Sequence, residues 1–223
     1  MHFDNPISMP RGSHFGSNYW EVYSSKMKRK ACFFSNLEYE NFLLLEINPK
    51  VKAICEQPLA IEVIIDGKLK KSVFDMWVKY TDNTEEMQEV KYRDSLDGDS
   101  DEAIRNREQI RKQTLWCNEN NMPYTIRTEV DIHIGHYTVL NASFIASRVR
   151  RYTVPKDIQA YVDILKGYMQ AYQKTDISTL IDSGILPIES ELNFLCYAHY
   201  IGIIEIDIHH RPIDNKSEVY LYG

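Results

Sequence analysis

The stretch SVFDMWVKYTDNTEEMQEVKY, residues 72–92, contains two apolar segments separated by the polar sequence TDNTEE. This pattern predicts two antiparallel strands joined by a turn. If the turn centres on Asp82, Asp75 and Glu89 lie opposite each other, because each is seven residues from it. Opposed side chains on paired strands are about 5 Å apart, and like charges placed there repel each other. A divalent cation that takes oxygen ligands, such as Mg²⁺, would stabilise the pair, so the sequence predicts a metal site.

Lys91 follows Glu89 by two residues, so both side chains point to the same face of a regular strand. A lysine beside a metal can orient water or stabilise charge that develops on a phosphate. Carboxylates, metal and lysine on one sheet face therefore indicate phosphodiester hydrolysis. Two structural alternatives remain open. An E-x-K pair is also typical of a solvated strand face, and a buried Asp75 would also be stabilised by an ion pair with Lys79 or Lys91.

The elements around this pair follow the order α-β-β-β-α-β. They are a helix over 35–48, strands over 59–65, 72–80 and 87–91, a helix over 100–121 and a strand over 122–129. Ser35 fits the N-cap of the first helix and Pro49 ends it. The connections between the first three strands are too short for parallel crossovers, which predicts an antiparallel meander. We therefore expect an α/β fold with a mixed sheet.

The predicted pattern of helices and strands changes after residue 153. Three helical segments (156–172, 176–184 and 188–202) precede a hairpin of 203–209 and 217–222, which is the pattern of a winged helix. Residues 151–223 contain 6 Lys and Arg against 10 Asp and Glu. Because an acidic module binds DNA poorly, contact with protein is the better expectation. We expect an N-terminal arm over 1–30, a nuclease domain over 31–153 and a winged-helix-like domain over 154–223.

Composition narrows the class of protein. A net charge of −6 argues against nonspecific coating of nucleic acid, but it permits local basic patches. The four cysteines form no C-x-x-C pair, which favours free thiols in a cytoplasmic protein over zinc ligands or disulfides. No apolar run approaches the length of a membrane span, and the first 20 residues do not resemble a secretion signal.

Asp75 and Glu89-Val90-Lys91 on this element order resemble the PD-(D/E)xK core of restriction-endonuclease-like proteins. Phe74 stands where that pattern has proline, a position that contributes no chemistry. A more extensive resemblance, over residues 25–223, is to TnsA, the endonuclease subunit of heteromeric, Tn7-like transposases. It is carried by SNLEYENFLLLEINPKVKAICEQP, the "FD" strand, EVKY, the long charged helix and MPYTIRTE, and by the C-terminal GILPIESELNFLCYAHYIGIIEIDI.

The resemblance implies a Mg²⁺-dependent endonuclease, with Mn²⁺ as a substitute, that nicks the 5′ ends of a mobile element. Its catalytic residues would be Glu38, Asp75, Glu89 and Lys91, with Glu38, Asp75, Glu89 and the Val90 carbonyl as metal ligands. The implied partners are double-stranded DNA at the transposon ends, a TnsB-like DDE transposase and a TnsC-like AAA+ regulator that binds the C-terminal domain.

Several assignments remain open. Ser35-x-x-Glu38 also fits a capping box, and Glu40 and Glu46 are the fallback candidates for the helix carboxylate. Candidate phosphate contacts are Lys26, Lys28, Arg29, Lys30, Arg148, Arg150 and Arg151, with Arg111 and Lys112 as weaker ones. The alternative functions are a free-standing restriction-like or repair nuclease and a non-catalytic DNA-binding adaptor.

Overall fold

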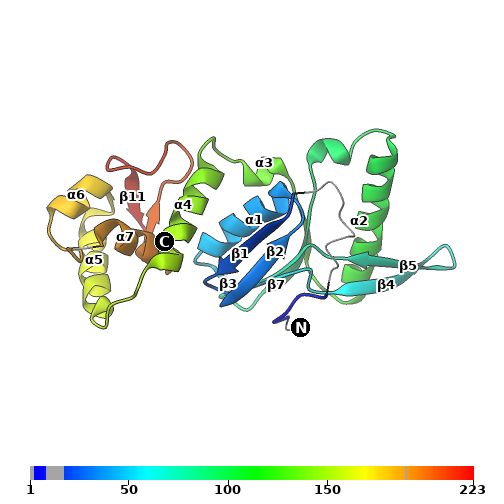
Figure 1. Cartoon of the computed structure of the whole chain (residues 1–223), viewed down its shortest axis with the longest axis horizontal. Coiled ribbons are helices and arrows are strands. Elements are labelled where there is room, and N and C mark those ends of the chain that lie inside the picture. The colour runs from blue at the N-terminus through cyan, green and yellow to red at the C-terminus, as the bar shows by residue number, and fades with distance from the viewer. Residues whose placement is uncertain (1–2, 9–17, 189) are drawn as a thin grey trace. The chain divides into compact units, whose positions relative to one another are not determined.

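A computed structural model describes residues 3–8, 18–188 and 190–223 (Figure 1). The chain forms two compact units, one of residues 1–45 and 50–132 and the other of residues 46–49 and 133–223. The first unit ends at residue 132, which is earlier in the chain than the domain boundary expected at residue 153. The expected domain boundaries stay a prediction. Of the expected N-terminal arm, residues 1–2 and 9–17 lie outside the described residues.

A four-stranded mixed sheet forms the centre of the first unit. Its strands, in spatial order, are β3 (Val51–Glu56), β6 (Met76–Tyr80), β7 (Glu85–Val90) and β8 (Tyr124–Arg127). β3–β6 and β6–β7 pair antiparallel and β7–β8 pairs parallel. The α/β prediction with a mixed sheet is therefore confirmed.

Two helices cover opposite faces of this sheet. They are α1 (Asn36–Ile47) and α2 (Asp101–Glu119). Successive residues of β7 identify the faces, because Gln88 accepts a hydrogen bond from Asn41 of α1 and Glu89 accepts one from Gln113 of α2. Side chains alternate across a strand, so these two helices lie on different sides. The order α1, β3, β6, β7, α2, β8 is the predicted α-β-β-β-α-β.

The identity of the first core strand was predicted wrongly. The apolar segment 59–65 forms β4 (Ala60–Ile65), which pairs with β5 (Lys68–Val73) in a separate two-stranded hairpin. The missed β3 takes its place in the sheet. The hairpin turn at Asp66-Gly67 is as predicted, and both residues have positive φ, as a tight hairpin turn requires. The expected strand 72–80 is divided at Phe74–Asp75 into β5 and β6, so the expected three-stranded meander is not formed.

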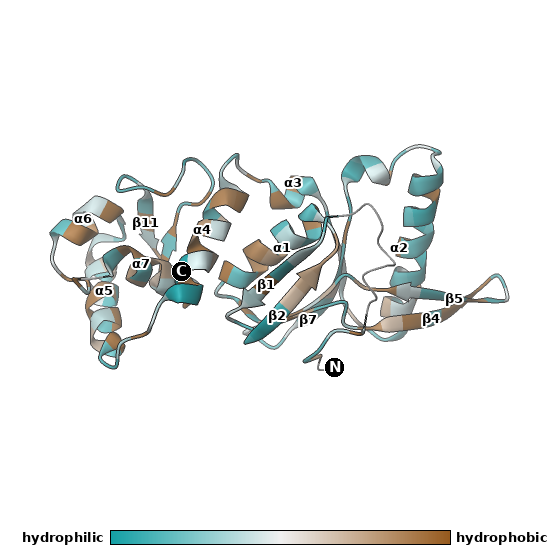
Figure 2. Ribbon diagram, in the orientation of Figure 1, coloured by the Kyte–Doolittle hydropathy of each residue, from teal (hydrophilic) through white to brown (hydrophobic). Residues whose placement is uncertain are grey.

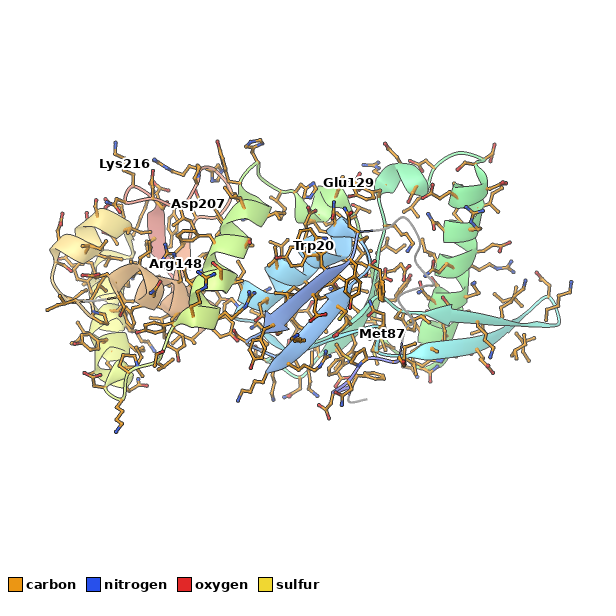
Figure 3. The ribbon with its side chains drawn as sticks, in the orientation of Figure 1. Trp20, Met87, Glu129, Arg148, Asp207 and Lys216 are labelled. Atoms are coloured by element: carbon orange, nitrogen blue, oxygen red, sulfur yellow. The ribbon has the colours of Figure 1, made fainter. Side chains whose placement is uncertain are left out.

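A second hairpin, also missed, precedes α1. It consists of β1 (Trp20–Ser24) and β2 (Arg29–Phe33), so part of the expected arm is strand. The ring of Trp20, labelled in Figure 3, stacks on Tyr39 of α1 with 4.3 Å between ring centroids. Phe33 is fully buried and stacks on Phe42 of the same helix. These aromatic contacts hold the hairpin against α1.

Two short elements complete the first unit. A 3₁₀ turn, η2 (Arg93–Ser95), lies between β7 and α2, and helix α3 (Glu129–Ile132) follows β8. The N-cap of α2 is Ser100, whose Oγ accepts a hydrogen bond from the Ala103 N–H at 3.1 Å. The predicted start of this helix is confirmed.

In its described residues, the second unit contains four helices and a three-stranded antiparallel sheet. The elements are α4 (Thr138–Arg151), α5 (Ile158–Tyr172), β9 (Lys174–Asp176), α6 (Ile177–Asp182), α7 (Glu191–Tyr200), β10 (Ile204–Ile206) and β11 (Glu218–Leu221). The sheet order is β10-β11-β9. The expected helices and the β10–β11 hairpin are present, whereas α4 and β9 were not predicted. The core of the second unit includes the fully buried Leu165, Met169, Phe194 and Leu195.

The cysteines carry free thiols, as expected. Within the part of the chain that the structure describes, no helix combines the length and apolar character needed to cross a bilayer.

Candidate active site

Asp75 and Glu89 face each other across two paired strands. The β6–β7 register runs from Met76 opposite Gln88 to Lys79 opposite Glu85, and one further step places Asp75 opposite Glu89. The Val90 N–H donates a hydrogen bond to Asp75 Oδ2 at 2.8 Å, which fixes the aspartate at this level of the sheet. Glu89 is fully buried. The predicted juxtaposition is therefore present, at the point where the β4–β5 hairpin ends and β6 begins.

Lys91 lies directly beyond the end of β7 and joins both carboxylates. Its Nζ donates to Glu89 Oε1 at 2.5 Å and lies 3.8 Å from Asp75 Oδ2. Burial by itself lowers the pKa of Lys91, but the charges of Asp75 and Glu89 outweigh that effect and raise the pKa above its ordinary value. The amine is therefore protonated at neutral pH. In this arrangement it supplies positive charge rather than acting as a base.

Glu38 both caps the start of α1 and lies beside the Asp75–Lys91 pair, which are the two positions that the sequence left open. Its N–H donates to Ser35 Oγ at 3.1 Å, its Oε1 accepts from the Ser35 hydroxyl at 2.9 Å and its Oε2 accepts from the Phe34 N–H at 3.2 Å. These bonds form a variant of the capping box, in which the carboxylate bonds the Phe34 amide instead of that of Ser35. The same carboxylate lines the cleft beside Asp75 and Lys91. Capping and membership of the site therefore do not exclude each other.

The carboxylates of this cluster repel one another. Burial, and then the charge of Asp75, raise the pKa of Glu89 to about 8, against the hydrogen bonds from Lys91 and Gln113. Burial and Asp75 likewise raise the pKa of Glu38 to about 7, although Phe34, Ser35 and Lys91 oppose the shift. One lysine thus does not neutralise three acidic side chains held together away from water. Strongly shifted pKa values of this kind cluster at functional sites.

Gln113 and Tyr124 form a second layer behind Glu89, and sequence reasoning missed both. Gln113 is fully buried on α2, and its Nε2 donates to Glu89 Oε2 at 2.6 Å and to the Val73 carbonyl at 2.9 Å. The Tyr124 hydroxyl donates to Gln113 Oε1 at 2.6 Å. One signal was available in the sequence. Gln113 lies at helical spacing between Ile110 and Cys117, so a polar residue interrupts the buried stripe of α2.

A cleft of about 620 Å³ opens onto these groups. Glu38, Asp75, Val90 and Lys91 line it. β5 contributes Lys71, Ser72 and Val73 to its wall, and α2 contributes Arg105, Gln109 and Lys112. Glu102 and Glu108 of α2 also line the cleft, so its outer walls carry basic, amide and acidic side chains. Lys71, Arg105 and Lys112 are the groups among them that could contact a phosphodiester.

The donor set fits a divalent cation in chemistry, although its side chains are not arranged as a closed coordination site. Oxygen ligands suit Mg²⁺, and Asp75, Glu89 and Glu38 supply them with net negative charge. Within residues 3–8, 18–188 and 190–223, no group of three His, Cys, Asp or Glu side chains converges closely enough to hold a metal ion.

The basic cluster before the first helix is largely used in contacts within the first unit. Arg29 forms two hydrogen bonds with Glu56, at 2.6 and 2.7 Å, and Glu56 is almost fully buried. The Nζ of Lys26 donates to the Val51 carbonyl at 2.7 Å, and Lys30 pairs with Glu21. Lys28 is exposed in the tight turn between β1 and β2. Their assignment as phosphate contacts stays a prediction.

The second basic run lies on the last turn of α4, in the second unit. Arg148, labelled in Figure 3, donates to Asn193 Oδ1 at 2.8 Å and lies 4.3 Å from the ring centroid of Phe144. It thereby joins α4 to α7. Arg150 and Arg151 are less engaged: Arg151 is exposed, and so is Arg150. As DNA contacts, all three remain predictions.

Comparison with protein families gives a match over much of the first unit. Residues 48–129 match the family described as TnsA-like endonuclease N terminal. This segment is a TnsA-like endonuclease domain. The match contains Asp75, Glu89, Lys91, Gln113 and Tyr124, so the register, ion pairs and second layer described above all lie within it. Glu38 and the rest of α1 precede it.

The TnsA-like domain covers less than half of the chain, and comparison with curated proteins gives no match. The predicted resemblance is confirmed over residues 48–129. A TnsA-like endonuclease domain indicates a nuclease associated with a transposase, with DNA as substrate.

Proposed function

We propose that this chain is the endonuclease subunit of a heteromeric transposase and that it nicks the 5′ ends of a mobile element. The observation that carries the proposal is the arrangement of Asp75, Glu89 and Lys91, joined by ion pairs inside the segment that matches TnsA-like endonucleases. The scaffold is a restriction-endonuclease-like core. A structural ion pair alone would not need three carboxylates for one lysine.

In the proposed mechanism, each side chain acts from the position it already has. The protonated Lys91 faces the cleft beside Asp75 and Glu89, where it can orient the attacking water and stabilise charge on the phosphate. Gln113 holds Glu89 in one orientation through its 2.6 Å hydrogen bond. The buried sheet face excludes bulk water behind the cluster. Hydrolysis leaves a 3′-hydroxyl and a 5′-phosphate.

Asp75 and Glu89, with the Val90 carbonyl and with Glu38 in support, are the groups proposed to hold Mg²⁺ or, as a substitute, Mn²⁺. The ion would supply positive charge that acidifies water and polarises the phosphate. The carboxylate cluster fits this role because burial and then the charge of Asp75 raise the pKa of both Glu38 and Glu89. Positive charge bound there would offset the repulsion between these carboxylates.

The second unit is proposed to be a winged-helix-like module that binds the AAA+ regulator. Its order α5-β9-α6-α7-β10-β11, with two C-terminal strands forming a hairpin, supports this assignment. Ile164 and Tyr172 of α5 remain 49% and 63% exposed, which offers apolar area for a protein partner on an acidic module. Titration of the full chain with the regulator tests this, with Ile164→Asp expected to weaken binding.

The decisive experiment measures strand cleavage at transposon ends by the full chain with its transposase and Mg²⁺. We expect Asp75→Ala and Lys91→Ala each to abolish 5′ nicking while 3′ cutting by the transposase continues. Lys79→Ala is the matched control, because Lys79 pairs with Glu85 outside the cleft. Circular dichroism and thermal unfolding establish that the variants remain folded.

Retained 5′ nicking in either site variant would contradict the proposal. Cleavage by the wild-type chain without any partner would instead favour a free-standing nuclease. An inactive wild-type chain that binds no Mg²⁺ or Mn²⁺ in calorimetric titration would favour the adaptor.

A further inference from the structure

The hairpin of β4 and β5 projects from the first unit beside α2 (Figure 1). Its second strand is the more polar of the two, as the teal colour of β5 against the largely brown β4 shows in Figure 2. β5 carries Lys68, Lys70 and Lys71, and all three are exposed. A two-stranded ribbon of this kind is the right size to lie in the major groove of duplex DNA.

The lysines of β5 differ in whether acidic side chains neutralise them. Lys71 pairs with Glu62 across the hairpin at 2.7 Å. Lys68 and Lys70 have no acidic partner within the described part of the chain. At the turn, Asp66 lies 3.8 Å from Arg111 of α2, so this acidic group already faces a cation. Two unneutralised ammonium groups therefore remain on the projecting strand.

This basic strand continues into the wall of the active-site cleft. Lys71 lines the cleft together with Lys112 of α2, and the Lys112 Nζ donates to the Lys71 carbonyl at 3.2 Å. The base of the hairpin adjoins the catalytic cluster, because Asp75 follows directly after β5 and Phe74. A polyanion bound in the cleft would pass along the same surface on its way out.

We infer that the β4–β5 hairpin is a DNA-binding arm, and that Lys68 and Lys70 contact phosphates of the duplex beside the scissile one. The inference rests on the proposed function for its substrate and extends it to a surface that nothing above assigns. Duplex DNA is the occupant because a chain of net charge −6 places these free cations next to a phosphodiester site. Most of the basic cluster at 26–30, by contrast, is engaged within the protein.

A simpler role for these lysines is protection of the exposed edge of β5 against pairing with another chain. Edge protection predicts that neutralising them promotes self-association and leaves the salt dependence of DNA binding unchanged. Phosphate contact predicts that self-association does not change and that the salt dependence of DNA binding becomes weaker. A salt titration of DNA binding, together with a measurement of self-association, therefore distinguishes the two roles.

The test is the double variant Lys68→Gln/Lys70→Gln in the full chain. Its control is Lys156→Gln/Lys166→Gln, which changes two exposed lysines of the second unit and gives the same net charge. Affinity for a labelled duplex is measured by fluorescence anisotropy in EDTA between about 50 and 200 mM salt, so that no cleavage occurs. Analytical ultracentrifugation reports self-association of each variant.

We expect the hairpin variant to bind more weakly and to lower the slope of log K against log salt by about 1 to 2, since each phosphate contact contributes about 0.9. The control should match the wild type. Equal slopes for all three proteins, or no binding by the wild type at the lowest salt, would overturn the inference. Because no cleavage is involved, a wild-type chain that binds through the hairpin but cuts nothing would refute the proposed function alone.

Discussion

Gln113 Nε2 and Glu89 Oε2 lie 2.6 Å apart, which is a short hydrogen bond between two fully buried side chains. The Tyr124 hydroxyl occupies the other end of the same amide, so Gln113 cannot rotate without losing one of its partners. A residue on α2 and a residue on β8 thereby control the orientation of the carboxylate on β7. Groups of this kind behind a site are commonly as sensitive to mutation as the ligands themselves.

We expect Gln113→Leu to lower nicking at limiting Mg²⁺ by about 10- to 100-fold, because Glu89 loses its donor and its orientation. Tyr124→Phe removes only the hydroxyl that orients Gln113, so its effect should be smaller. Asn118→Ala, an exposed change on the same helix, is the control. The measurement is the rate of nicking against Mg²⁺ concentration. A loss that is the same at all Mg²⁺ concentrations would show that Gln113 does not act through Glu89 as the proposed metal ligand.

The raised pKa values of Glu89 and Glu38 predict pH-dependent metal binding. These groups release their protons near pH 8 and pH 7 instead of near the ordinary value of 4.5. A divalent ion binds the deprotonated carboxylate, so affinity for Mg²⁺ or Mn²⁺ should increase from pH 6 to pH 8.5 and binding should release protons at the lower pH. Calorimetric titration in buffers of different ionisation enthalpy counts those protons. An affinity that does not change with pH would contradict the prediction.

The same shifts predict how the stability of the metal-free chain depends on pH. Between pH 4.5 and the raised values, the folded state binds more protons at these carboxyls than the unfolded state does. Their contribution to the free energy of unfolding therefore falls as pH rises through this window. Burial is the main cause of both raised pKa values and the charge of Asp75 adds to it. Asp75→Asn removes that charge, so the fall should be smaller in that variant. Urea unfolding at several pH values, in EDTA, compares the two proteins.

Arg29 should matter for stability more than for DNA binding. Its guanidinium forms two hydrogen bonds with Glu56, which is only 1% exposed. Arg29→Ala leaves that carboxylate buried without its partner, and we expect a loss of about 3 to 5 kcal/mol in the free energy of unfolding. Lys30→Ala breaks the solvent-exposed pair with Glu21 and should change stability little. A weakened affinity for DNA with unchanged stability would assign Arg29 to the phosphate surface instead.

Asn41 provides a test on the other face of the sheet. Its Nδ2 donates to Gln88 Oε1 at 2.9 Å, and both residues are buried. Asn41→Leu leaves the Gln88 amide without its donor, at a cost of about 1 to 3 kcal/mol in the free energy of unfolding. Activity per folded molecule should remain near that of the wild type, because Gln88 points away from the cleft. Thermal unfolding and single-turnover nicking separate the two quantities.

The part of the site that could be predicted from the sequence is the part fixed by a short turn. Asp75, Glu89 and Lys91 lie within 17 residues of one another, and a hairpin register follows from the position of its turn. Val90 and Lys91 follow from the same strand. Gln113 and Tyr124 come from elements further along the chain. The hydrogen bonds from Tyr124 to Gln113 and from Gln113 to Glu89 depend on how α2 and β8 pack, which no local pattern specifies.

The errors in the fold have a related cause. β3 contains Glu56, an acidic residue that is unusual in a buried core strand. Arg29, which is distant in sequence, forms the ion pair that allows its burial. The segment 59–65 is more apolar and β-branched, so it appeared the better core strand although it belongs to the projecting hairpin. Strand propensity identified a strand in each case, but membership of a sheet depends on partners distant in sequence.

The base of the β4–β5 hairpin is closed by a hydrogen bond from the Gln57 N–H to the Asp75 carbonyl at 2.9 Å and by one from the Phe74 N–H to the Leu59 carbonyl at 3.3 Å. The two ends of the insertion therefore meet, and the sheet register on either side does not depend on what lies between them. The length and sequence of such a closed hairpin can therefore vary without a change in the strands on either side of it. Changes in its length or sequence would alter the DNA contacts inferred for this hairpin, while Asp75, Glu89 and Lys91, the proposed catalytic residues, would keep their positions.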